Sequence, residues 1–249
     1  MAGKAIHKSA ERVDRLMERA SHALVATRYF EAERLCVECL RLAHADHDFE
    51  RMTRVVLPLQ EARRQKRQIA VDANRCFLVA AHPPDVIVPG CYLFQPPLIG
   101  ADARAFREAA DGSKVPVLVL TREPLTRDGK WPVVAVGVVS VRNKLNPPWP
   151  LERVETSKTK DNVDGVTHGP PPVQWFQSAA EALGDSAIAR VNPEDPPAWQ
   201  VEDLVEYLDA HPDHELLHQR LADTCRLAMT QPVPDRKRRR THLDHPYSF

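Results

Sequence analysis

The sequence predicts an α+β fold that is mostly helical, with helical hairpins at both ends around a small, largely antiparallel sheet. Two observations support this class. In the first and last thirds of the 249 residues, apolar side chains recur every three or four positions, as they do along the buried face of a helix. Between these parts lie short Val-rich runs bounded by proline and glycine, which are typical of strands and turns.

Three helices are predicted in the first third. Their expected ranges are 9–27, 30–43 and about 46–71. Ser9 is of a residue type favoured as an N-cap, and either Asp46 or Asp48 is suited to cap the third helix. Pro58 is expected to kink that helix or divide it in two, because proline has no backbone N–H.

The middle of the chain predicts short strands and one short helix. The expected strands cover 76–80, 86–88, 115–121 and 132–142, and the helix covers 101–110. The last two strands are rich in valine and are separated by a segment with Asp128-Gly129, so we expect them to form an antiparallel hairpin. Residues 143–172 are polar and rich in proline, which predicts irregular coil.

The last third returns to helical spacing. Helices are expected over 173–183, 198–209 and 212–229, the last of them opened by Pro212 in its first turn. Ten acidic and two basic residues lie from Asp185 to Asp223, and a basic tail follows. The predicted regions are a helical hairpin region 1–72, a sheet region 73–142, a Pro-rich connector 143–172, a C-terminal helical region 173–230 and a basic tail 231–249.

The composition excludes several classes of protein. Its 34 Lys+Arg and 34 Asp+Glu give no net charge, which argues against a binder of nucleic acid or membrane surfaces over its whole extent. The sequence has no Gly-rich phosphate-binding loop, and its most apolar run, 133–141, is too short to span a bilayer. Five cysteines are too sparse for a disulfide framework. We therefore expect a cytoplasmic protein without membrane contact.

In the first and last thirds of the chain, small and large apolar residues occupy set positions of the predicted helices. In the first hairpin these are Leu16, Ala20, Ala23, Leu24, Tyr29, Ala32, Cys36, Cys39, Leu40 and Leu42, and near the other end Leu204, Tyr207, Leu208, Pro212, Leu221, Ala222 and Cys225. This pattern resembles the tetratricopeptide repeat (TPR), a helix–turn–helix unit, and covers about a third of the chain. The resemblance implies a non-catalytic scaffold that binds an unidentified protein and carries no cofactor.

The N-terminal helices are expected to offer the partner-binding surface. The candidate contact residues are two aromatic residues after the first predicted turn and three arginines of one basic helical run: Tyr29, Phe30, Arg63, Arg64 and Arg67. The simpler interpretation of that basic run is a solvated helix face.

One motif points to catalysis instead. His214-Glu215-Leu216-Leu217-His218 has the form H-E-x-x-H, in which two histidines one helical turn apart bind zinc and the glutamate activates the zinc-bound water. A zinc-dependent hydrolase with His214 and His218 as ligands and Glu215 as base is therefore the alternative function. Against it, no glutamate follows Glu215 to serve as the third ligand, and the spacing of Asp223, His242 and His245, which could take that place, does not favour them. We also expect His214 in an exposed first turn. We favour the interpretation without an enzyme activity, in which Glu215 is an acid suited to a helix N-terminus.

Two further features remain. Cys36 and Cys39 form a C-x-x-C within a predicted helix, and we interpret them as core residues. The tail carries a basic run that suggests a second alternative, contact with nucleic acid through counterion release. Its residues are Arg236, Lys237, Arg238, Arg239 and Arg240.

Overall fold

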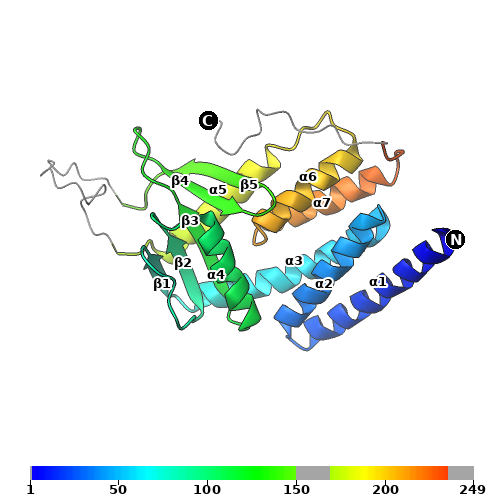
Figure 1. Ribbon diagram of the computed structural model, residues 1–249, viewed down its shortest axis with the longest axis horizontal. Coiled ribbons are helices and arrows are strands. Elements are labelled where there is room, and N and C mark those ends of the chain that lie inside the picture. Colours follow the sequence, from blue (N-terminus) through cyan, green and yellow to red (C-terminus); the bar gives the residue numbers. More distant parts are fainter. Residues whose placement is uncertain (1, 150–168, 235–249) are drawn as a thin grey trace, which may run out of the picture. The chain divides into compact units, whose positions relative to one another are not determined.

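The computed structural model describes residues 2–149 and 169–234, with side chains from residue 10 onward. Over these residues the chain is α+β and mostly helical, which confirms the predicted class (Figure 1). The helices are α1 (Ala2–Val25), α2 (Tyr29–Ala45), α3 (Phe49–Asp72), α4 (Gly100–Gly112), α5 (Val173–Ile188), α6 (Pro197–Ala210) and α7 (Glu215–Ala228). The strands are β1 (Cys76–Val79), β2 (Gly90–Phe94), β3 (Val117–Arg122), β4 (Trp131–Val136) and β5 (Ser140–Leu145).

These elements form two compact units. The helical unit comprises 2–68, 137–140 and 184–234 of the described residues, and the sheet unit comprises 69–136, 141–149 and 169–183. The first three helices, most of α3 included, therefore belong to the same unit as α6 and α7. Among the described residues, no helix combines the length and the apolar character that a bilayer crossing requires.

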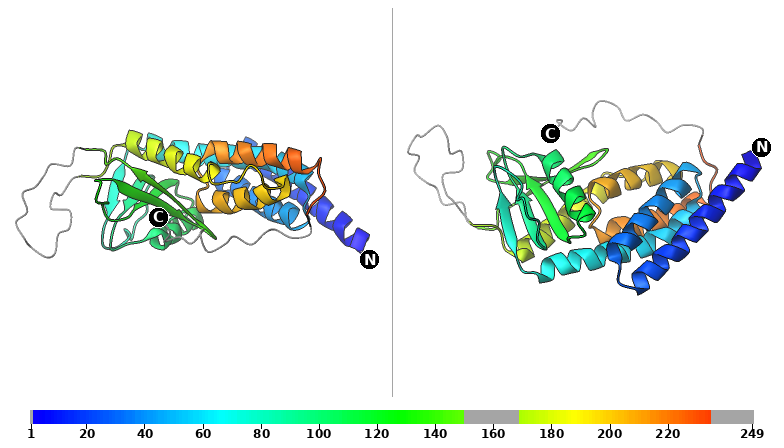
Figure 2. Two further views of the ribbon diagram at one scale, coloured as in Figure 1. Left: turned by 90° about the horizontal axis from the view of Figure 1, so that it is seen from above. Right: turned by 60° about the horizontal axis from the view of Figure 1, so that its bottom comes forward.

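The first three helices are joined by two turns of the same backbone form. Thr27 and His47 both adopt the left-handed conformation, with φ of 57° and 52°. In each turn, the N–H of the next residue donates back to a carbonyl of the preceding helix: Arg28 to Ala23 (2.8 Å) and Asp48 to Ala43 (2.8 Å). Such bonds satisfy carbonyls at a helix end and reverse the chain. As a result, α1 and α2 lie side by side, as the right-hand view of Figure 2 shows.

Small residues allow these three helices to pack closely. Ala23 of α1, Ala32 of α2 and Ala62 of α3 form one buried cluster, each with no exposed surface. Cys36 and Cys39 on α2 are also fully buried, and burial raises the pKa of both thiols to about 12. The two cysteines therefore stay protonated at neutral pH and pack as small apolar side chains.

The sheet is mixed, with the strand order β1-β2-β3-β4-β5. Strands β1 and β2 are parallel, as are β2 and β3, whereas β3 and β4 are antiparallel. The predicted hairpin of the last two Val-rich runs is thus confirmed, but the expectation of a largely antiparallel sheet is wrong. For the β2–β3 pair the reason is α4, which packs on β3 and connects the two strands, since a helical crossover of this kind joins parallel strands. Strands β1 and β2 are parallel although residues 80–89 between them form no helix.

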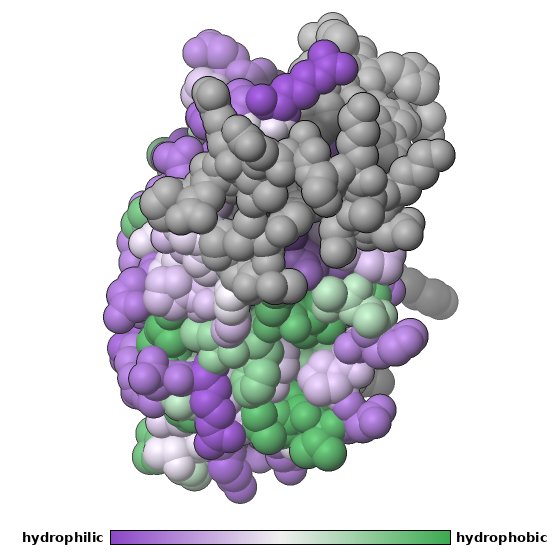
Figure 3. Space-filling view, turned by 90° about the vertical axis from the view of Figure 1, so that its left-hand side faces the viewer, coloured by the Kyte–Doolittle hydropathy of each residue, from purple (hydrophilic) through white to green (hydrophobic). Residues whose placement is uncertain are grey.

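The sheet unit has an apolar core and also carries apolar side chains on its surface. Phe106 of α4 packs against Tyr92 and Phe94 of β2 to form that core. Outside it, Val86 is 75% exposed and Ile99 is 61% exposed. Figure 3, which faces the side where β1 lies in Figure 1, shows hydrophobic residues gathered on one part of this surface.

Several predicted element boundaries are wrong. Helix α1 begins at Ala2, so Ser9 lies inside it and is no N-cap. Pro58 lies inside α3 and does not divide that helix in two. Residues 86–88 form no strand, and the second strand is β2, whose first residue is Gly90. The predicted strand 132–142 is divided at 137–139 into β4 and β5. In contrast, Asp48 caps α3 as predicted, since its Oδ1 accepts from the N–H of Arg51 at 3.0 Å.

Candidate functional site

The basic run of α3 and the H-E-x-x-H residues of α7 are bonded to each other. Arg63 Nη1 lies 3.2 Å from His218 Nε2, and Arg67 Nη2 donates to Glu215 Oε1 at 2.8 Å. Arg67 Nη1 also donates to the carbonyl of Asp213 at 3.0 Å. Two motifs about 150 positions apart in the sequence therefore form one site. We call it the ion cluster and define it as Glu33, Arg63, Lys66, Arg67, Glu215 and His218.

Glu33 of α2 holds the centre of the ion cluster. Its Oε1 accepts from Arg63 Nε at 2.8 Å and its Oε2 from Lys66 Nζ at 2.5 Å. The three side chains are between 11% and 14% exposed. Burial alone would raise the pKa of Glu33, but the charges and hydrogen bonds of Arg63 and Lys66 lower it to about 2. Glu33 is therefore ionised at neutral pH and offsets two nearly buried cations.

His218 is held as a neutral imidazole. Its Nδ1 lies 2.9 Å from the carbonyl of His214, which can only accept, so Nδ1 carries the proton. The lone pair of Nε2 then accepts from the Arg63 guanidinium. Burial, and next the charge of Arg63, lower the pKa of His218 to about 3. This side chain is 1% exposed and links α3 to the first turn of α7.

His214 caps the N-terminus of α7. Its Nδ1 accepts from the N–H of Leu217 at 3.2 Å, and its Nε2 lies 3.3 Å from Oδ1 of Asp185. The expectation that Pro212 opens this helix and that His214 lies in its exposed first turn is wrong, because α7 begins at Glu215 and His214, the residue before it, is 1% exposed. Gly184 explains the burial: a Cβ at this position would overlap the His214 ring, so a residue without a side chain is needed there.

In each of the two histidines, one ring nitrogen already accepts a hydrogen bond within the protein. A zinc ligand would need a free lone pair, and those of His214 Nδ1 and His218 Nε2 already accept hydrogen bonds. Zinc at His218 would also have to displace the cationic Arg63. Over residues 10–149 and 169–234, no group of three His, Cys, Asp or Glu side chains is placed to hold a metal ion. The geometry therefore gives these residues a structural role, and the hydrolase alternative stays a hypothesis.

The candidate contact residues of the N-terminal helices divide into two groups. Arg63 and Arg67 belong to the ion cluster, and the ring of half-buried Phe30 lies 4.4 Å from Lys66 Nζ. Arg64 is more accessible: its side chain is 42% exposed and pairs with Glu61 on the same helix at 2.8 Å. Half-buried Tyr29 begins α2. Of the five candidates, Tyr29 and Arg64 are therefore the two that neither belong to the ion cluster nor, like Phe30, contact its Lys66.

Sequence reasoning missed Glu33 and Lys66. Glu33 is an ordinary helical glutamate in the sequence, and its partners are 30 and 33 positions away. The basic run of α3 was itself a signal that acidic partners lie nearby. Several cations on a helix with a partly buried face need counter-ions. The basic tail residues 236–240 lie outside the described part of the chain.

Comparisons with known proteins add no relative. No family model matches the chain, and searches of the curated proteins and of the solved structures returned no match.

Proposed function

We propose that this chain is a non-catalytic scaffold that binds a partner protein in the cytoplasm through its TPR-like helices. The observation that carries the proposal is the construction of α1–α3: three helices joined by two turns of the same form and packed through fully buried small residues. Helical hairpins built this way bury their faces against their neighbours and leave an outer surface for a partner.

The ion cluster supports this function by fixing the binding surface. Glu33 ties α2 to α3, and Arg63 and Arg67 tie α3 to α7. His44 of α2 further contacts Glu202 of α6 at 3.0 Å. A surface fixed in this way loses little conformational freedom when a partner binds, which favours affinity.

Tyr29 and Arg64 are the proposed partner contacts. Tyrosine and arginine are enriched among the residues that dominate binding energy at protein interfaces. Arg64 has an accessible side chain, because its pairing with Glu61 leaves 42% of it exposed. Tyr29 is the first residue of α2 and precedes Phe30. The Phe30 ring contacts Lys66, which belongs to the ion cluster and is two positions from Arg64 in the sequence.

The double substitution Tyr29→Ala with Arg64→Ala is expected to weaken partner binding about tenfold or more, since two contact residues each contribute about 1 kcal/mol or more. The test is quantitative mass spectrometry of proteins retained from a lysate by the immobilised full chain, followed by calorimetry with the purified partner. Arg41→Ala, at an exposed arginine of α2, is the matched control and should bind like the wild type. Retention of nothing above bare matrix, or equal affinity of all three chains, would contradict the proposal.

A further inference from the structure

The parallel strands of the sheet unit end at a common edge. Strands β2 and β3 are parallel neighbours, in register from Gly90 with Val117 to Phe94 with Thr121. Residues 95–99 follow β2 and lead into α4, and residues 123 and 124 follow β3. In open sheets with parallel strands, ligands bind outside the carboxyl ends of those strands. A small-molecule site in this unit is therefore expected at this edge.

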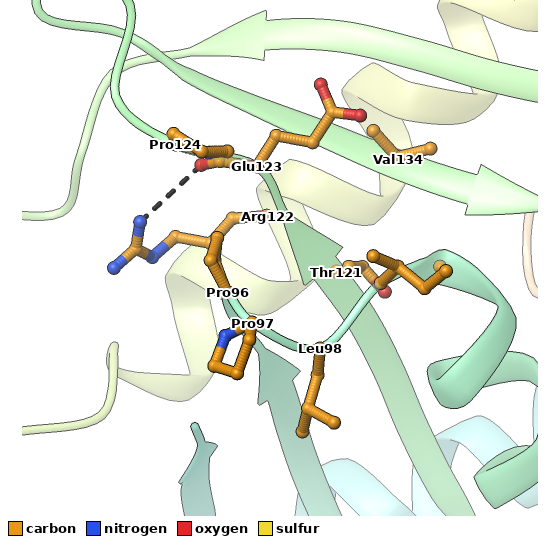
Figure 4. A pocket seen from close by; sticks show the side chains of 10 residues that line it. Pro96, Pro97, Leu98, Thr121, Arg122, Glu123, Pro124 and Val134 are labelled. Atoms are coloured by element: carbon orange, nitrogen blue, oxygen red, sulfur yellow. Dashed lines mark hydrogen bonds between the residues drawn. The ribbon is translucent and has the colours of Figure 1, made fainter. Parts of the chain in front are cut away.

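A pocket of about 280 Å³ lies at this edge (Figure 4). The loop 96–100 forms one wall, and residues 121–124 with Val134 of β4 form the other. Pro96, Pro97, Leu98 and Val134 give it a largely apolar lining. All of these residues belong to the sheet unit.

The Thr121 hydroxyl is the polar group that this pocket leaves available. The residue is 2% exposed and lies opposite Val134 in the β3–β4 pair. Among the described residues, no hydrogen bond joins this hydroxyl to another group of the protein, and its oxygen is not fully buried, so it stays accessible from the pocket. A hydroxyl that has little access to water and no partner within the protein is suited to donate to an acceptor atom of a ligand.

The first turn of α4 supplies further donors to the same pocket. Helix α4 begins at Gly100, which lines the pocket. The N–H groups of Asp102 and Ala103 donate to the carbonyl of Ile99. Helix geometry leaves the N–H groups of Gly100 and Ala101 without an intrahelical acceptor, so they are suited to bind an acceptor atom of a ligand.

The charged side chains around the pocket are bonded within the protein, although the buried Nε atoms of Arg122 and Arg142 are not. Asp102 accepts from the N–H of Ile99 at 2.8 Å, and Glu123 pairs with Arg142. Arg122 donates to Gln95 Oε1 at 2.6 Å and lies 4.5 Å from the ring of Trp131. Among the residues that line the pocket, Arg122 and Glu123 carry opposite charges, so the lining has no net charge and favours a ligand without net charge.

We propose that this pocket binds a small uncharged molecule with a carbonyl group. The carbonyl oxygen accepts from the Thr121 hydroxyl and from the N-terminus of α4, and an apolar body packs against Pro96, Pro97 and Leu98. The volume lies just below the usual range for ligand pockets, about 300–1,000 Å³, which favours a ligand of fragment size. The site belongs to the sheet unit and is independent of the protein-binding role proposed for the helices.

The test is titration of the ¹⁵N-labelled full chain with phenylacetamide, followed by amide chemical shifts. For a ligand of this size we expect a dissociation constant of about 1 mM or tighter, with shifts confined to residues 95–101 and 121–124. Thr121→Val keeps the shape of the side chain and removes the donor, so it is expected to weaken binding about tenfold while the fold is retained. Thr53→Val, in α3 of the helical unit, is the matched control and should bind like the wild type.

Three results would overturn this proposal. The first is the absence of shifts up to the solubility limit of phenylacetamide. The second is unchanged binding by Thr121→Val. The third is tighter binding of phenylacetate than of phenylacetamide, because a carboxylate ligand would show that the pocket selects an anion.

Discussion

Replacing Glu33 with glutamine is expected to destabilise the helical unit by about 3–5 kcal/mol, the range for breaking a buried ion pair. Glu33 is the carboxylate between Arg63 and Lys66, at 2.8 Å and 2.5 Å. Glutamine keeps the shape but leaves two cations, 11% and 12% exposed, without their counter-ion. Urea denaturation followed by circular dichroism at 222 nm measures the change.

Glu38→Gln is the matched control for this prediction. Glu38 lies on the same helix and pairs with Arg12, whose side chain is 55% exposed. A solvent-exposed pair contributes about 0–1 kcal/mol, so this variant should unfold almost like the wild type. Equal effects of the two substitutions would show that the ion cluster contributes no more than a surface ion pair.

His218 is expected to make the stability of the helical unit fall as the pH is lowered from 6.5. The folded protein lowers the pKa of His218 from its ordinary 6.5 to about 3, so the unfolded chain binds the proton first. Stability from this group is therefore complete above pH 6.5 and is lost progressively down to about pH 3. The uptake of one proton by the unfolded chain lowers the free energy of unfolding by about 2–3 kcal/mol between pH 6.5 and 4.5. Glu33 takes up its proton only below this pH range.

His218→Gln tests this dependence, because a glutamine side chain can donate to the His214 carbonyl and accept from Arg63 but does not titrate. The free energy of unfolding of this variant should change less than that of the wild type between pH 6.5 and 4.5. His22→Gln, at an exposed position of α1, should retain the wild-type slope. Parallel pH profiles for His218→Gln and the wild type would refute a neutral buried imidazole.

Local patterns predicted the helices of this protein well and the sheet less well. The expected helix 30–43 corresponds to α2, and 101–110 to α4, because helical spacing and turn residues are local signals. Strand β2 escaped prediction because Pro89-Gly90 looked like a turn. Gly90 begins the strand instead. A glycine is needed at this position because a Cβ would come within 2.7 Å of the Arg75 carbonyl oxygen. The parallel pairing of β2 with β3 depends on how α4 crosses over, and that of β1 with β2 depends on the path of residues 80–89. Short apolar runs reveal neither.

The site could be predicted only as separate pieces. The sequence showed the basic run with Arg63 and the motif with His218, and the structure brings them to 3.2 Å across 155 positions. No local pattern predicts which of many glutamates will neutralise a basic run, so Glu33 was missed. The burial of His214 depends on Gly184, a residue of another helix 30 positions away, and could not follow from the motif itself.

The most direct test of the central claim, that the H-E-x-x-H residues serve the structure of a protein-binding scaffold, is the zinc content of the untagged full chain. The protein is purified without chelators and measured by elemental mass spectrometry, with His218→Gln alongside. Because Arg63 and the N–H of Leu217 occupy the lone pairs that zinc would need, we expect no stoichiometric zinc in either protein. One zinc per wild-type chain that is lost in the variant would contradict the scaffold and favour the hydrolase.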